Sequence, residues 1–222
     1  MKVYFFPGMG ADESLAPFHK LPGHDVEWIP WPREFPAEWD GFLDAMTAAK
    51  SIEPDSVFVG ISFGGMAAQK LAQRIRPRGI ILISSLAQPS SIAVALRAFK
   101  PIVGYLPGIL FEMRLLPRPL GAWLFGVRDE DDIGLLYRMA AAVAREELRR
   151  LNILALHFAP DGIGGVPIRA IHGAKDRIIK AGAERRDRIL EKGGHLISMT
   201  HTDAVNGALQ EWIGEWEEDR RA

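Results

Sequence analysis

The sequence contains no cysteine among its 222 residues, which excludes disulfide bonds and thiolate chemistry. It also lacks an excess of either charge. The formal net charge is −1, so the composition indicates neither a nucleic acid nor another polyanionic partner. The uncharged, largely apolar run at residues 101–111 is far below the ~20 residues that span a bilayer, and we expect no integral membrane segment.

The first residues leave little room for a secretory signal. The apolar run Val3–Phe6 ends at Pro7-Gly8, which is too short for the apolar core of a signal peptide, and we expect a cytoplasmic protein. No internal repeat or low-complexity segment interrupts the chain. Its length fits one large α/β domain and is short for two.

Short apolar runs alternate with segments of helical periodicity. The expected strands are 3–6, 26–29, 57–59, 80–83, 166–171 and 188–191. Between them, Asp12 is a candidate cap for a short helix, and the apolar spacing from Trp39 to Met46 predicts one helix face. This alternation predicts a parallel sheet with right-handed crossovers and helices on both faces.

One long segment breaks the alternation. Between Ser85 and Pro160 we find no convincing strand, but helical runs at 92–99, 107–116 and 132–156, with much apolar sequence. We therefore divide the chain into a core, residues 1–86 and 161–222, and an inserted helical cap, residues 87–160. A lid over an apolar pocket is the interpretation we favour. Ordinary core packing, a homodimer interface through the apolar cap, and a surface that meets lipid are the alternatives.

The segment Gly60-Ile61-Ser62-Phe63-Gly64 lies between an expected buried strand and an expected helix. This spacing is that of a nucleophile elbow, where a serine on a sharp turn projects its hydroxyl at a helix N-terminus. Glycines without a Cβ let the strand and the helix approach closely. The alternative is a glycine-rich turn without chemistry. We interpret Ser62 as the nucleophile.

A serine nucleophile needs a base, and catalytic groups in open α/β sheets gather beyond the carboxyl ends of the strands. His195 follows the sixth expected strand in a glycine-containing loop, and we select it as the base. His201, near the last helix, is its main rival, and we expect His172 to serve the turn after the fifth strand. The other histidines fit surface or structural positions: His19, His24 and His157.

The base in turn needs a carboxylate that orients it. Asp176 stands in the loop after the fifth strand, one strand away from the His195 loop, and completes the chain order Ser, Asp, His. The alternative for Asp176 is a helix cap or a salt bridge to a neighbouring basic residue. Asp161 precedes the fifth strand and lies at the wrong edge, and Asp203 is better placed to cap the last helix.

Three segments together resemble the signatures of the α/β-hydrolase superfamily: Gly60-Ile61-Ser62-Phe63-Gly64-Gly65, His172-Gly173-Ala174-Lys175-Asp176 and Gly193-Gly194-His195. The resemblance covers nearly the whole chain. It implies a six-stranded parallel sheet in the order 2-1-3-4-5-6, without the two leading strands of the full family sheet, and a variable cap at residues 87–160. It also implies that Ser62, His195 and Asp176 form a catalytic triad.

The same resemblance implies an oxyanion hole made by the backbone N–H groups of Phe63 and Met9. Where the family often has His-Gly, this chain has Pro7-Gly8. The implied function is that of a serine hydrolase, without metal or cofactor, which acts on a small, largely apolar carboxylic ester through an acyl-enzyme. A thioesterase, a lactonase, a C–C hydrolase and a non-catalytic ligand-binding protein are alternatives on the same fold.

Overall fold

The computed structural model describes residues 1–86, 100–101, 103–107, 109, 112, 115–159, 163–180 and 187–219. The expected helix at 92–99 lies outside these residues, and the one at 107–116 lies within them only in part.

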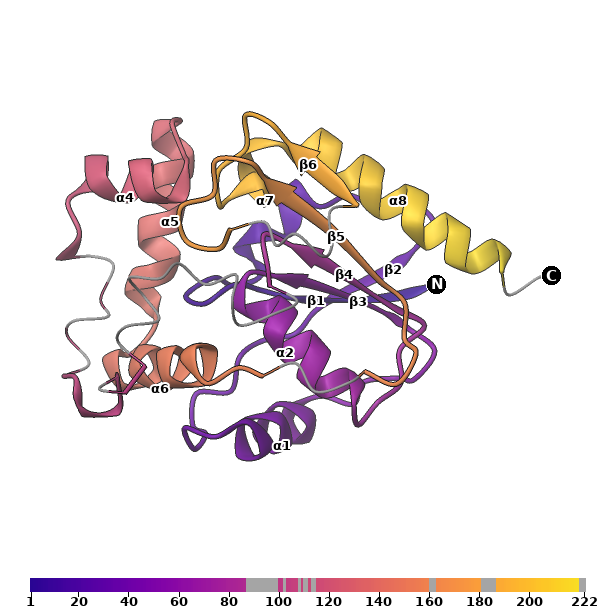
Figure 1. The fold of residues 1–222 in the computed structure, drawn as a ribbon, viewed down its shortest axis with the longest axis horizontal. Helices are drawn as coiled ribbons and strands as arrows, with labels where there is room; N and C mark the ends of the chain where they lie inside the picture. The colour runs from indigo at the N-terminus through magenta and orange to yellow at the C-terminus, as the bar shows by residue number, and fades with distance from the viewer. Residues whose placement is uncertain are drawn as a thin grey trace.

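A six-stranded, all-parallel sheet in the order β2-β1-β3-β4-β5-β6 forms the centre of the molecule (Figure 1). Its strands are β1 Lys2–Phe6, β2 Asp25–Trp28, β3 Val57–Ile61, β4 Gly79–Ile83, β5 Ile168–Gly173 and β6 Arg188–Leu190. The α/β class and the strand order predicted above are confirmed. The fifth strand begins and ends two residues later than expected, which places His172 inside it.

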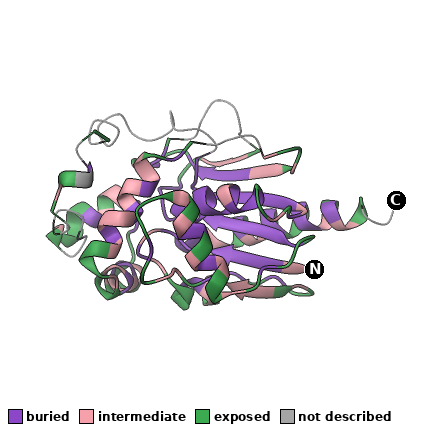
Figure 2. Ribbon diagram, turned by 90° about the horizontal axis from the view of Figure 1, so that it is seen from below, coloured by how far each residue is buried: buried purple, intermediate pink, exposed green. Residues whose placement is uncertain are grey.

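The side chains of the central strands alternate between two hydrophobic cores. Tyr4 and Phe6 of β1 face one core, whereas Val3 and Phe5 face the other. This alternation is the period of two that a strand imposes. Because both cores are covered by helices, these strands are buried and apolar along their length, as Figure 2 shows in purple.

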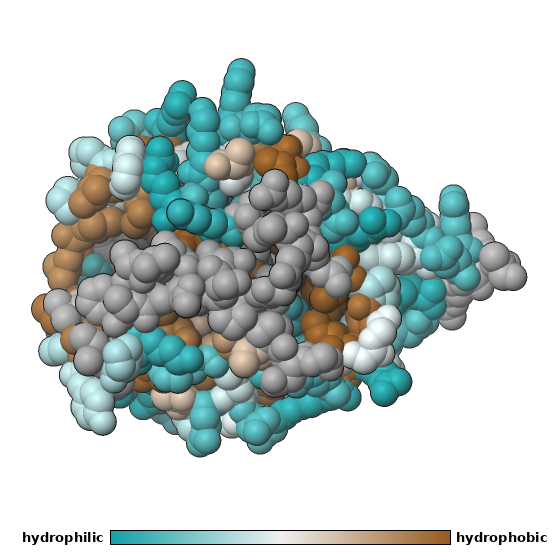
Figure 3. Space-filling model, viewed as in Figure 1, coloured by the Kyte–Doolittle hydropathy of each residue, from teal (hydrophilic) through white to brown (hydrophobic). Residues whose placement is uncertain are grey.

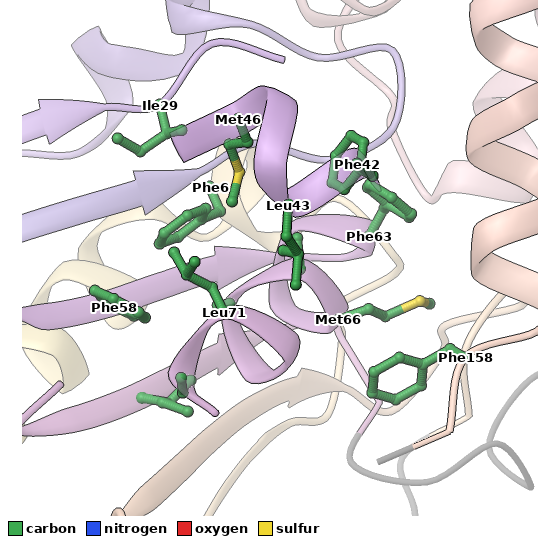
Figure 4. Close-up of a cluster of buried hydrophobic side chains, with 14 of the residues drawn as sticks. Phe6, Ile29, Phe42, Leu43, Met46, Phe58, Phe63, Met66, Leu71 and Phe158 are labelled. Atoms are coloured by element: carbon green, nitrogen blue, oxygen red, sulfur yellow. The ribbon is translucent and has the colours of Figure 1, made fainter. Parts of the chain in front are cut away.

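The first core lies under α1 (Trp39–Ala49) and α2 (Phe63–Ala72). Figure 4 shows side chains from these helices meeting those of β1 and β3, with Phe42 and Phe63 side by side. Their rings lie 5.8 Å apart in an edge-on contact. The residue after Ser62 is therefore fixed in a packed aromatic cluster.

The second core lies under α8 (Thr202–Glu218), which buries Val205, Leu209, Trp212 and other apolar residues. The short helix η1 (Glu13–Phe18) and α7 (Ile197–Thr200) cover the same face. Asp12 caps η1 as expected, since its carboxylate accepts the Ser14 N–H at 2.8 Å.

Between β4 and β5 the described chain forms helices only: η3 Val103–Tyr105, α4 Arg118–Phe125, α5 Glu130–Ala142 and α6 Arg145–Leu156. These helices gather beyond the carboxyl ends of the strands (Figure 1). Among the described helices, none is long and apolar enough to cross a membrane. The boundaries of a cap at 87 and 160 stay a prediction.

The single helix expected over 132–156 is wrong, because Val143 and Ala144 adopt extended backbone and divide it into α5 and α6. The break has a packing reason. The apolar face of α5, for example Ile133, belongs to the second core, whereas Leu151 and Leu154 of α6 belong to the first. One straight helix has one apolar stripe and cannot serve both.

Candidate active site

Ser62 occupies a sharp turn between β3 and α2. Its backbone has φ 51° and ψ −118°, a conformation that costs free energy for a residue with a Cβ. The glycines around it are needed for space. A Cβ on Gly64 would lie 2.0 Å from the Phe6 carbonyl oxygen, and a Cβ on Gly60 would lie 2.3 Å from the Gly65 Cα.

Hydrogen bonds hold the strained main chain of Ser62 on both sides. The Ser62 N–H donates to the Ile83 carbonyl at 2.9 Å, which extends the pairing of β3 with β4. The Ser62 carbonyl accepts the Gly65 N–H at 3.0 Å and the Ser85 hydroxyl at 2.6 Å. Ser85 was missed by the sequence reasoning, although its place just after β4, beside β3, was a usable signal.

His195 reaches Ser62 from the loop after β6. Its Nε2 lies 2.9 Å from Ser62 Oγ, and its ring is 3% exposed. The loop is held by α4, because the Phe125 carbonyl accepts the N–H groups of His195 and Leu196, both at 3.1 Å. The Phe125 ring also packs edge-on against the imidazole, with centroids 5.8 Å apart.

Asp176 lies behind His195 in the loop after β5. Its Oδ2 is 2.8 Å from His195 Nδ1, and its Oδ1 accepts the N–H groups of Ile178 and Ile179 at 2.8 and 2.9 Å. Burial by itself would raise the pKa of Asp176. The charge of His195 and hydrogen bonds from two histidines and a backbone N–H outweigh burial and hold that pKa well below its usual value.

These partners fix the direction of each hydrogen bond. The ionised carboxylate of Asp176 only accepts, so His195 Nδ1 carries the proton and donates it. His195 Nε2 is then the unprotonated nitrogen and accepts the Ser62 hydroxyl proton. The structure thus brings Ser62, His195 and Asp176 into one continuous chain of hydrogen bonds.

His172, which we expected only to serve its turn, also contacts this chain. Its Nε2 lies 2.8 Å from the Ile179 carbonyl and 3.1 Å from Asp176 Oδ2. Both partners are acceptors, so Nε2 is protonated and donates to them. His172 therefore holds the loop closed and adds a donor to Asp176. The shift of β5 by two residues explains why the sequence pattern did not reveal this contact.

The rival residues lie elsewhere. His201 Nδ1 is 2.9 Å from the Thr200 hydroxyl, and Asp203 is exposed in the first turn of α8. His19 is buried against Phe5, and His157 bonds its own helix end. His24 lies beside the N-terminal amine, and Asp161 is outside the described residues.

The two residues expected to supply the oxyanion donors belong to segments next to Ser62. Phe63 is the first residue of α2, where backbone N–H groups have no carbonyl partner within the helix. Met9 belongs to the loop after β1, which runs alongside the serine: a Cβ on Gly8 would lie 3.6 Å from Ser62 Cβ. Asn152 of α6 donates to Met9 Sδ at 3.2 Å, so α6 also contacts this loop.

In the part of the chain that the structure describes, no group of three or more histidine or carboxylate side chains is placed to hold a metal ion.

A parallel sheet of this order, with a serine on the turn after its third strand, is the architecture of an α/β hydrolase. The chain belongs to the alpha/beta hydrolase family, whose sequence profile matches residues 6–208. No curated protein matches the sequence.

Solved structures with this fold align over almost the whole chain. An esterase from Thermogutta terrifontis superposes with a TM-score of 0.70 at 17% identity, covering 97% of this chain and 90% of that one. A bromoperoxidase from Bacillus anthracis gives 0.71 at 16% identity, with coverages of 96% and 91%. A meta-cleavage product hydrolase from Pseudomonas fluorescens IP01 gives 0.69 at 17% identity, with coverages of 97% and 91%. At such identities the likeness establishes the fold alone.

Proposed function

We propose that the protein is a serine hydrolase that cleaves small, largely apolar carboxylic esters through an acyl-enzyme. The observation that carries this proposal is the hydrogen-bonded chain from Ser62 Oγ through His195 to Asp176, with distances of 2.9 and 2.8 Å. A serine hydroxyl is a weak nucleophile by itself and becomes effective when an oriented base removes its proton.

The proposed reaction has two halves. Ser62 Oγ bonds to the acyl carbon while its proton passes to His195 Nε2. When the C–O bond of the ester breaks, His195 returns that proton to the leaving alkoxide. A water then gives a proton to His195 and attacks the acyl-enzyme. The acid leaves as the proton returns to Ser62.

Asp176 supports both halves without exchanging a proton itself. Its lowered pKa keeps the carboxylate ionised across the neutral range, where it stabilises the imidazolium that forms on His195. The N–H groups of Phe63 and Met9 would stabilise the oxyanion of each tetrahedral intermediate, which is commonly the largest electrostatic contribution to such reactions.

Side chains beside the reacting groups favour an uncharged substrate. The Phe125 ring packs on the imidazole, and the Met9 loop runs alongside Ser62. Charge on the acyl group would lose hydration at these surfaces without gaining a counter-charge from either side chain. This supports an apolar acyl group.

A substrate-class screen tests the proposal. Nitrophenyl esters from acetate to decanoate would be assayed beside a thioester and a lactone, together with labelling by a fluorophosphonate. We expect ester turnover and labelling in the wild type, and neither in Ser62→Ala. Ser51→Ala is the matched control, because Ser51 is exposed between α1 and β3 and should retain both activities. A wild type that neither hydrolyses an ester nor reacts with the fluorophosphonate would contradict the proposal.

A further inference from the structure

Trp31 follows β2 and reaches across to the loop after β1. Its indole Nε1–H donates to the Gly8 carbonyl oxygen at 3.2 Å. The Ala11 N–H donates to the same oxygen at 3.0 Å. The Gly8 carbonyl is therefore held from two directions, once from within its own loop and once by a side chain 23 residues away in sequence.

The bond to Gly8 determines where the Met9 N–H points. The Gly8 carbonyl and the Met9 N–H belong to one peptide plane, and in a trans peptide they point in opposite directions. A donor that fixes the direction of the carbonyl therefore also fixes the direction of the N–H group. Since Trp31 packs against the first core, it ties this peptide plane to that core and not only to the loop after β1.

The same side chain contacts the second oxyanion residue. The Trp31 ring packs edge-on against Phe63, with centroids 5.5 Å apart and an interplanar angle of 76°. It also packs against Phe42 at 5.5 Å, within the aromatic cluster of the first core. Trp31 thus touches the peptide that carries one donor and the ring of the residue that carries the other.

We propose that Trp31 is a positioning residue for the oxyanion hole. Trp31 sets the orientation of the Met9 N–H relative to the Phe63 N–H. The proposal rests on the function proposed above and extends it. Trp31 acts through the Gly8–Met9 peptide and does not touch the reacting atoms. Its effect should appear where negative charge develops on the substrate oxygen, and not in the binding of the neutral ester.

The decisive variant is Trp31→Phe, which keeps an aromatic ring in the cluster and removes the indole N–H. Loss of a whole oxyanion donor lowers kcat by about 10²–10³-fold. A donor that is retained but less well oriented should lower kcat by about 10-fold. We expect kcat to fall by that factor with KM changed less than about 2-fold. The inhibition constant of a trifluoromethyl ketone, which forms a tetrahedral oxyanion adduct with a serine, should rise by a similar factor.

Trp39 supplies a matched control. Its ring stacks on Phe63 at 5.6 Å and meets Phe42 at 5.9 Å, so it belongs to the same cluster. Its Nε1, however, is buried without a hydrogen-bond partner among the described residues. Trp39→Phe removes the same atoms from the same cluster and breaks no hydrogen bond to a described residue. We expect its kcat and inhibition constant to stay within about 2-fold of wild type.

A second replacement guards against misfolding. Placing 3-benzothienylalanine at position 31 retains the bicyclic shape and replaces only the N–H by sulfur, so it should reproduce the kinetic result of Trp31→Phe. Equal changes in the Trp31 and Trp39 variants, or a Trp31 effect confined to KM, would overturn the proposal while leaving ester hydrolysis intact. A wild type inactive on every ester would instead remove the proposed function and this inference with it.

Discussion

The central strands of the sheet are far more completely buried than the helices between β4 and β5. β1, β3 and β4 are buried almost throughout, whereas α5 and α6 each bury a single stripe, and α4 buries only Gly121. The most exposed large hydrophobic side chains of the described residues lie between 105 and 123. Figure 3 shows the corresponding hydrophobic surface, in brown, at the end of the molecule occupied by α4 and α5.

This difference separates rigidity from adaptability. Ser62, Asp176 and His195 all follow sheet strands, so their mutual distances depend on the register of β3, β5 and β6. Among the described residues, the helical segment contacts the His195 loop through Phe125 and the Met9 loop through Asn152. Sequence change in these helices can therefore alter what enters the site while the hydrogen-bonded chain stays in place.

The largest expected effect tests whether the site depends on the sheet loops alone. Asp176→Asn should lower kcat/KM by about 10⁴-fold, because the amide can hold His195 in the wrong tautomer and gives no charge to the imidazolium. Asp203→Asn, at an exposed position of α8, should leave kcat/KM unchanged. Steady-state ester kinetics measure both variants. A loss below about 10-fold in Asp176→Asn would place the carboxylate outside the reaction.

The next effect tests the tight packing of the elbow. Gly64→Ala places a Cβ 2.0 Å from the backbone oxygen of Phe6, and we expect it to lower the free energy of unfolding by about 3–4 kcal/mol. Gly214→Ala in α8 is the matched control. Its new Cβ meets nothing within 4 Å, so helix propensity should stabilise the protein by about 0.5–1 kcal/mol. Urea unfolding distinguishes the two, and similar stabilities would refute tight packing at the elbow.

A third prediction concerns the pH dependence of stability and His19, which packs against Phe5 of β1. Burial lowers the pKa of His19 from 6.5 to about 4, against a smaller opposing effect of its hydrogen bond to Asn206. The unfolded chain then binds more protons than the folded one between these values, so stability falls as pH falls through that range. Between pH 7 and 4.5 this group should cost about 2 kcal/mol.

His19→Phe tests this linkage, because Phe can keep the ring contacts with Phe5 and Trp28 and cannot titrate. The variant should lose less stability than wild type on acidification, measured by urea unfolding across the pH range. Parallel pH profiles for the two proteins would show that His19 is not the group responsible.

The smallest effect sharpens the comparison within the helical segment itself. Leu120 of α4 is 46% exposed, whereas Leu154 of α6 is 1% exposed. Leu120→Ala should change the free energy of unfolding by less than about 0.5 kcal/mol. Leu154→Ala should cost about 3 kcal/mol, because it leaves a cavity in the first core. Equal costs in thermal unfolding would mean that α4 packs against more of the molecule than the described contacts indicate.

The sequence predicted the fold and the residues that gather in the candidate site because both depend on local patterns. A glycine spacing indicated the elbow, and the loops after two strands indicated Asp176 and His195. Parallel strands bring such loops to one edge whatever their separation in the chain. The catalytic roles of Ser62, Asp176 and His195 stay predictions until the kinetics are measured.

Other features were not predictable from local patterns. The Ala-rich end of α5 favours helix, yet the chain turns at Val143 because two cores need two apolar stripes. The contacts of His172 and Trp31 depend on specific side-chain rotamers. Periodicity carries no information about such contacts.

The Phe125 carbonyl has a mechanical consequence. It receives the backbone N–H groups of both His195 and Leu196, and Gly126 lies so close to Gly194 that a Cβ there would approach the Gly194 Cα to 2.6 Å. The last turn of α4 is thus held tightly against the loop that carries His195. A rigid-body movement of α4 would therefore move His195 away from Ser62. Any movement that widens the entrance for substrate has to take place in other parts of the molecule.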